Sequence, residues 1–267
     1  MSKYGDILVS IFTSKFASDN RVDAIPFTRD DLIAHSNKLG FEPPKNLGDI
    51  VYAFRYRSDM PPEIESSAPD GYTWIIVGTG DAQYSFIKSR QSNIYPNPDL
   101  ISVRIPNNTP EILSLYSLSD EQSLLAKIRY NKILDLFLGI VTYSMQNHLR
   151  TKVQDIGQIE IDELYIGVNK IGQQFIMPVQ AKVGNDKIGA VQLYQDICYC
   201  KTVFPDLICV PIAVHYANEE VCMFRLALEN WSVGIVEERH YKLVPSTGID
   251  SDYIRSANTT AEPLLLE

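Results

Sequence analysis

The hydrophobic pattern of the first 90 residues predicts short helices followed by a β-hairpin. Apolar side chains recur at helical spacing, and Thr28 followed by Asp31 is a helix-start signal of the capping-box type. The expected helices cover residues 7–16, 28–40 and 47–57, and the hairpin covers 72–77 and 83–88. Helix, helix, helix, hairpin is the order of a winged helix-turn-helix, so we expect a winged-helix-like domain over residues 1–90.

The third expected helix of this domain carries basic and aromatic side chains, which are typical of a surface that recognises DNA. Tyr52 and Tyr56 lie among the basic residues. The candidate DNA contacts are Lys45, Asn46, Arg55 and Arg57. Two plainer interpretations stay open. Three helices and a hairpin are common in small domains, and basic residues at the end of a helix also stabilise its dipole.

A stretch rich in Asn and Pro separates this region from the rest of the chain. Residues 91–112 show little periodicity, and we expect a linker there, followed by a second domain over residues 113–267. Residues 117–150 are predicted to form one long helix, or two that break near Gly139, with a capping box that starts at Ser119.

After that helix the pattern changes to strands with one intervening helix. Strands are expected at 158–168, 174–183, 207–216, 220–228 and 238–244, with a helix at 190–204 and a loose tail at 250–267. The fold class is therefore α/β (α+β), with a mixed central sheet flanked by helices.

The composition is that of a globular protein, since 45% of the residues are hydrophobic and 21% are charged. No apolar run approaches the ~20 residues that span a bilayer, so we expect a cytoplasmic protein with no membrane partner. The four cysteines form no CxxC pair, which favours reduced thiols over disulfides or zinc. The net charge of −9 argues against nonspecific coating of nucleic acid. Residues 151–267 hold 9 basic and 16 acidic groups, an acidity that a metal-binding cleft tolerates.

Two neighbouring strands of the second domain carry polar residues at alternating positions. Glu160 and Asp162 share one face of the first strand, and Gln180 and Lys182 share one face of the second. Paired in register, these strands would bring Asp162, Gln180 and Lys182 together. Oxygen ligands of this kind suit Mg²⁺, which polarises a phosphate, and a lysine beside the metal orients the attacking water or neutralises developing charge. Phosphodiester hydrolysis needs a cluster of this kind.

These residues and their order resemble the PD-(D/E)XK nuclease superfamily, which includes many type II restriction endonucleases and the archaeal Holliday-junction resolvases. Asp162, in "IEIDELY", stands where the family has its first acidic ligand, and Gln180-Ala181-Lys182, in "PVQAK", stands for the (D/E)-x-K triplet. The resemblance implies a restriction-endonuclease-like core. It also implies that Asp162, Gln180 and the carbonyl of Ala181 are metal ligands and that Lys182 is catalytic. Glu121 resembles the acid that many members place on the helix before the sheet.

Gln180 departs from the family pattern, because an amide oxygen can coordinate Mg²⁺ but brings no charge. Glu160, as a further metal ligand, and Glu121 are the two catalytic candidates that would supply the missing charge. Gln192 and Gln195 resemble the polar residues that these nucleases carry on the following helix, and Gln192 is a candidate DNA contact.

The segment "MQNHLR" offers three more candidates at the expected end of the long helix. Asn147 and Arg150 would contact a phosphate, or they are ordinary C-terminal helix residues. His148 is a general base or a solvated histidine.

Together these features predict a Mg²⁺-dependent, sequence-specific double-strand DNA endonuclease of restriction type, with Mn²⁺ as a substitute metal. By resemblance it would be a bacterial homodimer that works alongside a cognate DNA methyltransferase. A structure-specific repair nuclease with the same core is one alternative. A winged-helix regulator with a degenerate nuclease core is another. The remaining one is a coincidental match, in which Lys182 merely ends a strand and Asp162 sits in a surface ion pair.

Overall fold

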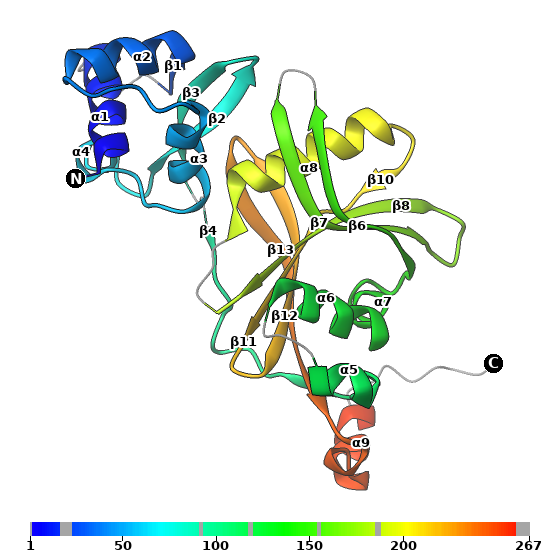
Figure 1. Ribbon diagram of the computed structural model, residues 1–267. Coiled ribbons are helices and arrows are strands. Elements are labelled where there is room, and N and C mark those ends of the chain that lie inside the picture. Colours follow the sequence, from blue (N-terminus) through cyan, green and yellow to red (C-terminus); the bar gives the residue numbers. More distant parts are fainter. Residues whose placement is uncertain are drawn as a thin grey trace.

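Two larger β-sheets, each covered by its own helices, make up most of the molecule (Figure 1). The computed structural model describes residues 2–16, 23–90, 93–116, 120–153, 156–184 and 188–259. The fold is mixed α+β, with a curled mixed sheet flanked by helices. Within the described ranges no helix is both long enough and apolar enough to cross a membrane.

The N-terminal lobe contains the predicted helices and the predicted hairpin, and it adds one strand and one short helix. Its elements are α1 (Lys3–Lys15), β1 (Ala24–Thr28), α2 (Arg29–Lys38), α3 (Gly48–Tyr56), α4 (Pro62–Glu65), β2 (Thr73–Gly80) and β3 (Gln83–Ser89). The sheet order is β1-β3-β2, antiparallel throughout. The capping box is present, since Thr28 and Asp31 bond reciprocally at the start of α2. A separate hydrophobic core, including Ile7, Trp74 and Phe86, holds this lobe together.

The second lobe is built on a sheet of order β5-β13-β12-β11-β8-β7-β6. Its strands are β5 (Val103–Pro106), β6 (Val141–Val153), β7 (Gly157–Val168), β8 (Gln174–Val183), β10 (Ile208–Cys209), β11 (Ile212–Ala217), β12 (Glu220–Glu229) and β13 (Ser232–Val244). The pairs β8–β11, β8–β10 and β5–β13 are parallel, and the other pairs are antiparallel. A two-stranded pair joins β4 (Asn93–Ile94) to β9 (Ile188–Gly189).

The expected linker at 91–112 contains regular structure. β5 lies inside that range and pairs in parallel with β13, so this segment is an integral edge of the sheet. Helix α5 (Glu111–Tyr116) follows it. The expected loose tail also contains a helix, α9 (Ser251–Thr259), and residues 260–267 lie outside the described part.

The prediction of one long helix over 117–150 is wrong, whereas the alternative break near Gly139 is present, although a strand and not a helix follows it. The segment forms α6 (Glu121–Tyr130), α7 (Ile133–Leu138) and then strand β6. Lys132 and Gly139 have left-handed backbones, with φ of 53° and 63°, and this conformation interrupts a right-handed helix at both places. Ser119 lies outside the described residues. The cap of α6 is Asp120, whose side chain accepts a hydrogen bond from the Ser123 amide.

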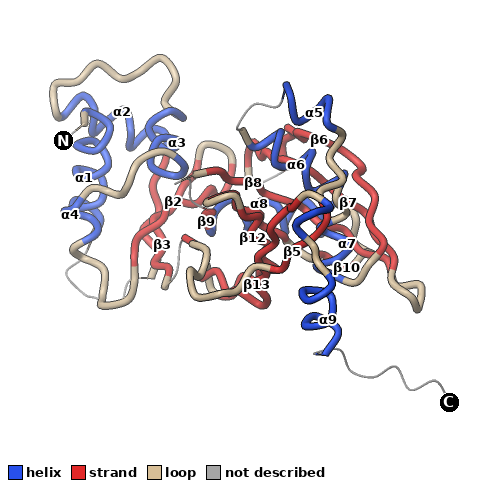
Figure 2. Tube along the Cα trace, turned by 90° about the horizontal axis from the view of Figure 1, so that it is seen from below, coloured by secondary structure: helices blue, strands red, loops and turns tan. Residues whose placement is uncertain are grey.

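Helices cover both faces of the large sheet, and the alternation of strand residues explains how. Val214 and Met223 pack with α6 and α7 on one face. Their chain neighbours Ala213 and Cys222 pack with α8 (Ala190–Val203) on the other. The two lobes lie side by side (Figure 2). They are in contact where the Ser89 Oγ atom donates a hydrogen bond to the Trp231 carbonyl at 2.7 Å.

Candidate functional site

Strands β7 and β8 bring the predicted acid and lysine together next to the N-terminus of α6. Their antiparallel register places Glu163 opposite Val179, and the Asp162 carboxylate accepts a hydrogen bond from the Ala181 amide at 2.8 Å. Lys182 Nζ lies 2.7 Å from Glu121 Oε1, so the first residue of α6 forms an ion pair with a residue of β8. Sequence reasoning proposed all three of these ionisable residues for one site, and the structure places them together.

Asp162 is a buried acid, with only 6% of its surface exposed. Burial raises the pKa of Asp162 to about 6, while the positive charge of Lys182 and the hydrogen bond from Ala181 oppose this rise. Glu121 and Glu160 raise it further by repulsion. A perturbed acid next to a paired lysine is the kind of arrangement found at functional sites.

Gln180 does not point into open space but is fixed in a buried hydrogen-bond network. Its amide nitrogen donates to Asp196 Oδ2 at 2.8 Å and to the Glu160 carbonyl at 3.1 Å. Its amide oxygen accepts from Gln192 Nε2 at 2.7 Å. Gln180 on β8 therefore links β7 to α8, and Gln192, a candidate DNA contact, is one of its partners.

Asp196 is the residue of this site that sequence reasoning missed. It is 1% exposed, and burial raises its pKa well above its usual range, with repulsion from Asp162 adding to the effect. Its Oδ1 atom is buried and makes no hydrogen bond in the described part of the chain. The sequence feature that could have identified Asp196 is its position in a helix rich in apolar residues, one helical turn after Gln192.

Glu160 and Glu121, the two candidates to supply the charge that Gln180 lacks, occupy different positions. The Glu160 carboxylate lies 3.0 Å from Arg150 Nη2 and 3.5 Å from His148 Nδ1, on the side of β6. Glu121 forms the ion pair with Lys182, and both Glu121 and Glu160 are electrostatically coupled to Asp162. The geometry therefore favours Glu121 over Glu160, and Asp196 enters as a third acid that touches Gln180 directly.

The donors at this site suit a hard divalent cation, because carboxylate, amide and carbonyl oxygens predominate. Asp162 would supply the central carboxylate, with Gln180, Glu160 and the Ala181 carbonyl as the other candidate ligands. The unpartnered Oδ1 of buried Asp196 fits a site that gains from added positive charge. Among the residues with described positions, no group of three or more His, Cys, Asp or Glu side chains is spaced to hold a metal ion by itself.

The candidate DNA contacts of the N-terminal lobe have different environments. Lys45 is exposed, and Asn46 bonds to Asp49 Oδ1 and to the Gly48 amide at the start of α3. Arg55 turns inward, where its Nε donates to the Ile76 carbonyl at 3.0 Å. Arg57 is exposed and its guanidinium lies 5.0 Å from the centre of the Tyr52 ring.

Asn147, His148 and Arg150 lie on strand β6 and not at a helix end, because the predicted helix is absent there. In the orientation that satisfies its amide, Asn147 donates to Glu163 and accepts from Arg129. It therefore links β6 to Glu163 on β7 and to Arg129 on α6, and both Asn147 and Arg150 are exposed, with Arg150 beside Glu160.

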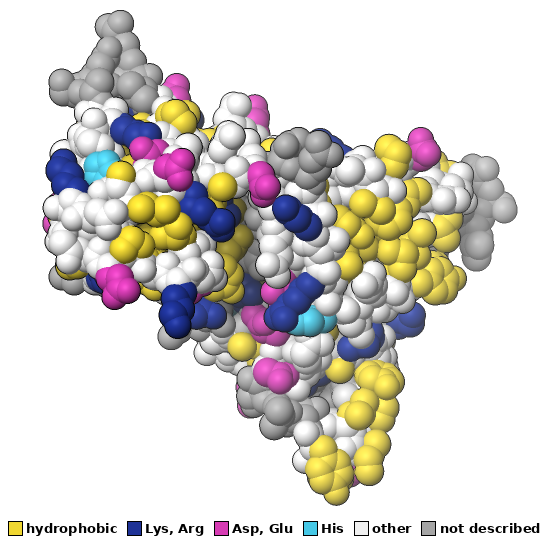
Figure 3. Space-filling view, turned by 45° about the horizontal axis from the view of Figure 1, so that its top comes forward, with side chains coloured by type: hydrophobic (Ala, Val, Ile, Leu, Met, Phe, Trp, Pro, Cys, Tyr) yellow, Lys and Arg dark blue, Asp and Glu magenta, His cyan; other side chains and the backbone are white. Residues whose placement is uncertain are grey.

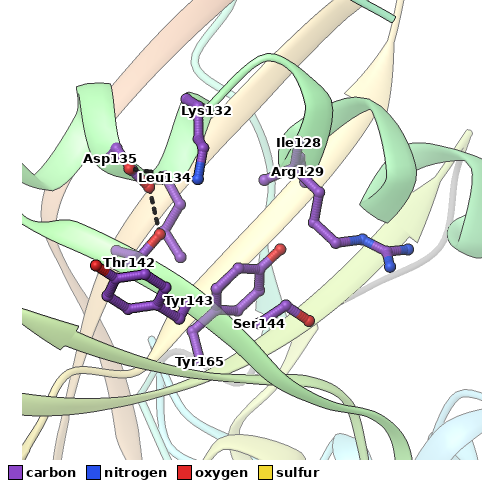
Figure 4. A pocket seen from close by; sticks show the side chains of 9 residues that line it. All are labelled: Ile128, Arg129, Lys132, Leu134, Asp135, Thr142, Tyr143, Ser144 and Tyr165. Carbon is purple, nitrogen blue, oxygen red and sulfur yellow. Dashed lines mark hydrogen bonds and ion pairs between the residues drawn. The ribbon is translucent and has the colours of Figure 1, made fainter. Parts of the chain in front are cut away.

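A cavity of about 260 Å³ lies on the other side of α6, between α6, α7, β6 and β7 (Figure 4). Lys132 and the Tyr165 hydroxyl point into it, and Asp135 bonds to Thr142 at one end. None of Asp162, Lys182 and Glu121 lines this cavity, so it is separate from the candidate site.

Comparison of the chain with family models, with curated proteins and with solved structures gives no match.

Proposed function

We propose that this protein is a metal-dependent deoxyribonuclease of the restriction-endonuclease type, with its site at Asp162, Lys182 and Glu121. The observation that carries the proposal is the cluster itself. A buried carboxylate with a raised pKa lies beside a lysine that a second carboxylate holds at 2.7 Å, all at the junction of two central strands and a helix start.

The chemistry follows from what each side chain offers. Bound Mg²⁺, with Mn²⁺ as a substitute, would polarise the scissile phosphate. Asp162 and the amide oxygen of Gln180 would hold it, with the Ala181 carbonyl and Glu160 as further ligands. Lys182, positioned by Glu121, supplies a fixed positive charge for the phosphate and a donor that orients the attacking water. The Gln180–Asp196 bond fixes the ligand strand against α8.

We further propose that the N-terminal lobe is a winged-helix-like recognition domain and that the substrate is double-stranded DNA. The order of α1, α2, α3 and the β2–β3 hairpin around its own core supports this assignment. Two copies of the chain would cut the two strands, and a DNA methyltransferase would protect the host sequence. On this proposal residues 113–267 form the nuclease domain. Strand β5, which precedes residue 113, belongs to the sheet of the same domain.

A test of the site uses unmethylated plasmid or phage DNA with Mg²⁺ or Mn²⁺. Asp162→Ala and Lys182→Ala are expected to lose cleavage, while Lys170→Ala, an exposed lysine in the β7–β8 turn, keeps it. Unfolding curves for all three variants separate loss of chemistry from loss of fold. Full cleavage by both site variants would refute the assignment.

A specific observation keeps a second function in view. The position that corresponds to the second metal-binding acid holds a neutral glutamine, whose amide nitrogen makes two internal hydrogen bonds and whose amide oxygen makes one. A non-catalytic DNA-binding regulator would have this property. It would shift a DNA fragment in a gel but would hydrolyse nothing with either metal.

A further inference from the structure

The cavity between α6, α7, β6 and β7 takes no part in the proposed function (Figure 4). All the residues that line it belong to the second lobe, and none of Asp162, Lys182 and Glu121 is among them. By contrast, the basic and acidic side chains that Figure 3 shows gathered with a histidine lie where the two lobes meet. The cavity of about 260 Å³ is therefore a separate candidate binding site.

The Tyr165 hydroxyl is a buried hydrogen-bond donor at the wall of this cavity. The residue is 3% exposed, and its hydroxyl points into the cavity, toward the space between Lys132 and Arg129 (Figure 4). Within the described part of the chain this oxygen makes no hydrogen bond of normal geometry. Burial and the nearby Glu163 carboxylate raise the pKa of Tyr165, so the hydroxyl keeps its proton. Such a donor is unfavourable until it has an acceptor, and the cavity is the side from which an acceptor can enter.

Lys132 supplies a positive charge beside this hydroxyl. Its side chain is 63% exposed, and its ammonium Nζ lies 3.9 Å from Asp135 Oδ2, which makes a long ion pair. The Asp135 carboxylate also accepts a hydrogen bond from Thr142. An exposed ammonium in a long ion pair, beside an acid that has another partner, can bind a second anion.

Arg129 adds a second positive charge, and a buried acid holds it in place. Its Nε lies 3.4 Å from Glu163 Oε1, and in the orientation that satisfies its own amide, Asn147 accepts from Arg129 Nη1 at 3.1 Å. Glu163 is fully buried and does not line the cavity. Two cations and one acid, Asp135, therefore line the cavity, and that acid is already bonded. This excess of donors favours a ligand rich in acceptor oxygens.

We propose that this cavity binds the oxyanion group of a small organic molecule. The group accepts a hydrogen bond from Tyr165 and pairs with Lys132 and Arg129, a chemistry that a phosphate monoester and a carboxylate share. Ile128 and Leu134 give the cavity an apolar wall for the body of the molecule. Ligand pockets commonly measure about 300–1,000 Å³, so a volume of about 260 Å³ suits a small ligand, such as one ring with its acidic group. The inference goes beyond the proposed function and does not depend on it.

The experiment is a calorimetric titration of the full-length, metal-free protein at low ionic strength. Phenyl phosphate and benzoate are the two anionic probes, and benzyl alcohol is a neutral probe of similar shape. At least one anion is expected to bind with millimolar affinity or better, and benzyl alcohol is expected not to bind. Tyr165→Phe should weaken binding about tenfold, because a hydrogen bond to a charged group is lost. Lys132→Met should weaken it as well, whereas Lys170→Met, at an exposed lysine in the β7–β8 turn, is the matched control and should bind like the parent.

Each outcome decides the inference. Binding of only one anion supports it and identifies the group as phosphate or carboxylate. Absence of binding by both anions at millimolar concentrations would overturn it, and so would equal affinity in the parent, Tyr165→Phe and Lys132→Met. Benzyl alcohol that binds as tightly as the anions would likewise overturn it, since the cavity would then recognise a ring and not an oxyanion. Tyr165→Phe keeps the ring that packs in the core, and urea unfolding of each variant separates loss of binding from loss of fold.

Discussion

Replacing Gln180 by glutamate tests the buried network and contradicts what the family resemblance alone would suggest. A glutamate completes the (D/E)-x-K pattern, so resemblance predicts a better metal site. The structure predicts a damaged one, because the Gln180 amide donates to Asp196 and to the Glu160 carbonyl, and a carboxylate can donate to neither. A buried acceptor without its donor costs about 1–3 kcal/mol, so two predict a loss of about 2–6 kcal/mol in the free energy of unfolding at pH 8.

The penalty should depend on pH. Next to Asp196, the new carboxyl group would have a raised pKa in the folded state, so at low pH it is protonated and donates one of the two hydrogen bonds, and the full cost appears as pH rises. Urea unfolding at pH 5 and pH 8 measures this difference. The double variant Gln180→Glu with Asp196→Asn reverses the donor and acceptor and should recover at least half of the loss. Gln158→Glu on the exposed part of β7 is the control, with a change within about 0.5 kcal/mol.

Two outcomes would refute this reasoning. One is a Gln180→Glu variant as stable as the parent at pH 8. The other is a double variant no more stable than the single one, which would mean that Asp196 is not the partner that matters.

Four further outcomes follow from neighbouring residues. In metal-free protein Asp162→Asn should gain about 1–3 kcal/mol of unfolding free energy at pH 8 and almost nothing below pH 4, because the raised pKa of about 6 makes the ionised acid unfavourable in the folded state; urea unfolding that shows no gain would contradict it. Asp196 has a pKa raised in the same direction, so Asp196→Asn should flatten the fall in melting temperature between pH 4 and pH 8, and an unchanged slope would count against its burial as a carboxyl group. A double-mutant cycle with Glu121→Gln and Lys182→Met should give a coupling of about 0.5–1 kcal/mol in the free energy of unfolding, and zero coupling would show that the ion pair does not contribute to stability. Thr28→Ala should cost about 1 kcal/mol through loss of the α2 cap, checked by urea unfolding against Thr259→Ala at the end of α9.

The elements predicted correctly are those with one unambiguous period. The helices of the N-terminal lobe, strands β7 and β8 and helix α8 all have such patterns. The helix prediction for residues 117–150 failed because the apolar residues continue at helical spacing beyond the point where the helix ends. Lys132 adopts a left-handed conformation, which the sequence does not mark with a glycine. Residues Val141–Val153 form a strand because they pair with β7, and not because of their own sequence pattern.

The site was partly predictable for the same reason. Alternation along two strands predicted that Asp162 and Lys182 share a site. Which side of α8 faces β8 depends on tertiary packing of Leu193 against Phe224, and no local pattern reports it. Asp196 was therefore missed, and Arg55 was expected at the surface although it points inward.

The balance of charge around Gln180 explains why a neutral residue is stable there. Asp162 and Glu121 bring two negative charges that Lys182 only partly offsets, and a further ionised acid at position 180 would leave Asp196 and the Glu160 carbonyl without their donor. Glutamine instead satisfies Asp196 through its nitrogen and leaves its oxygen to Gln192. The pKa values of Asp162 and Asp196 are both raised, so their ionised forms cost folding free energy. Such a cost to folding is expected where a residue set is retained for binding or chemistry rather than for stability.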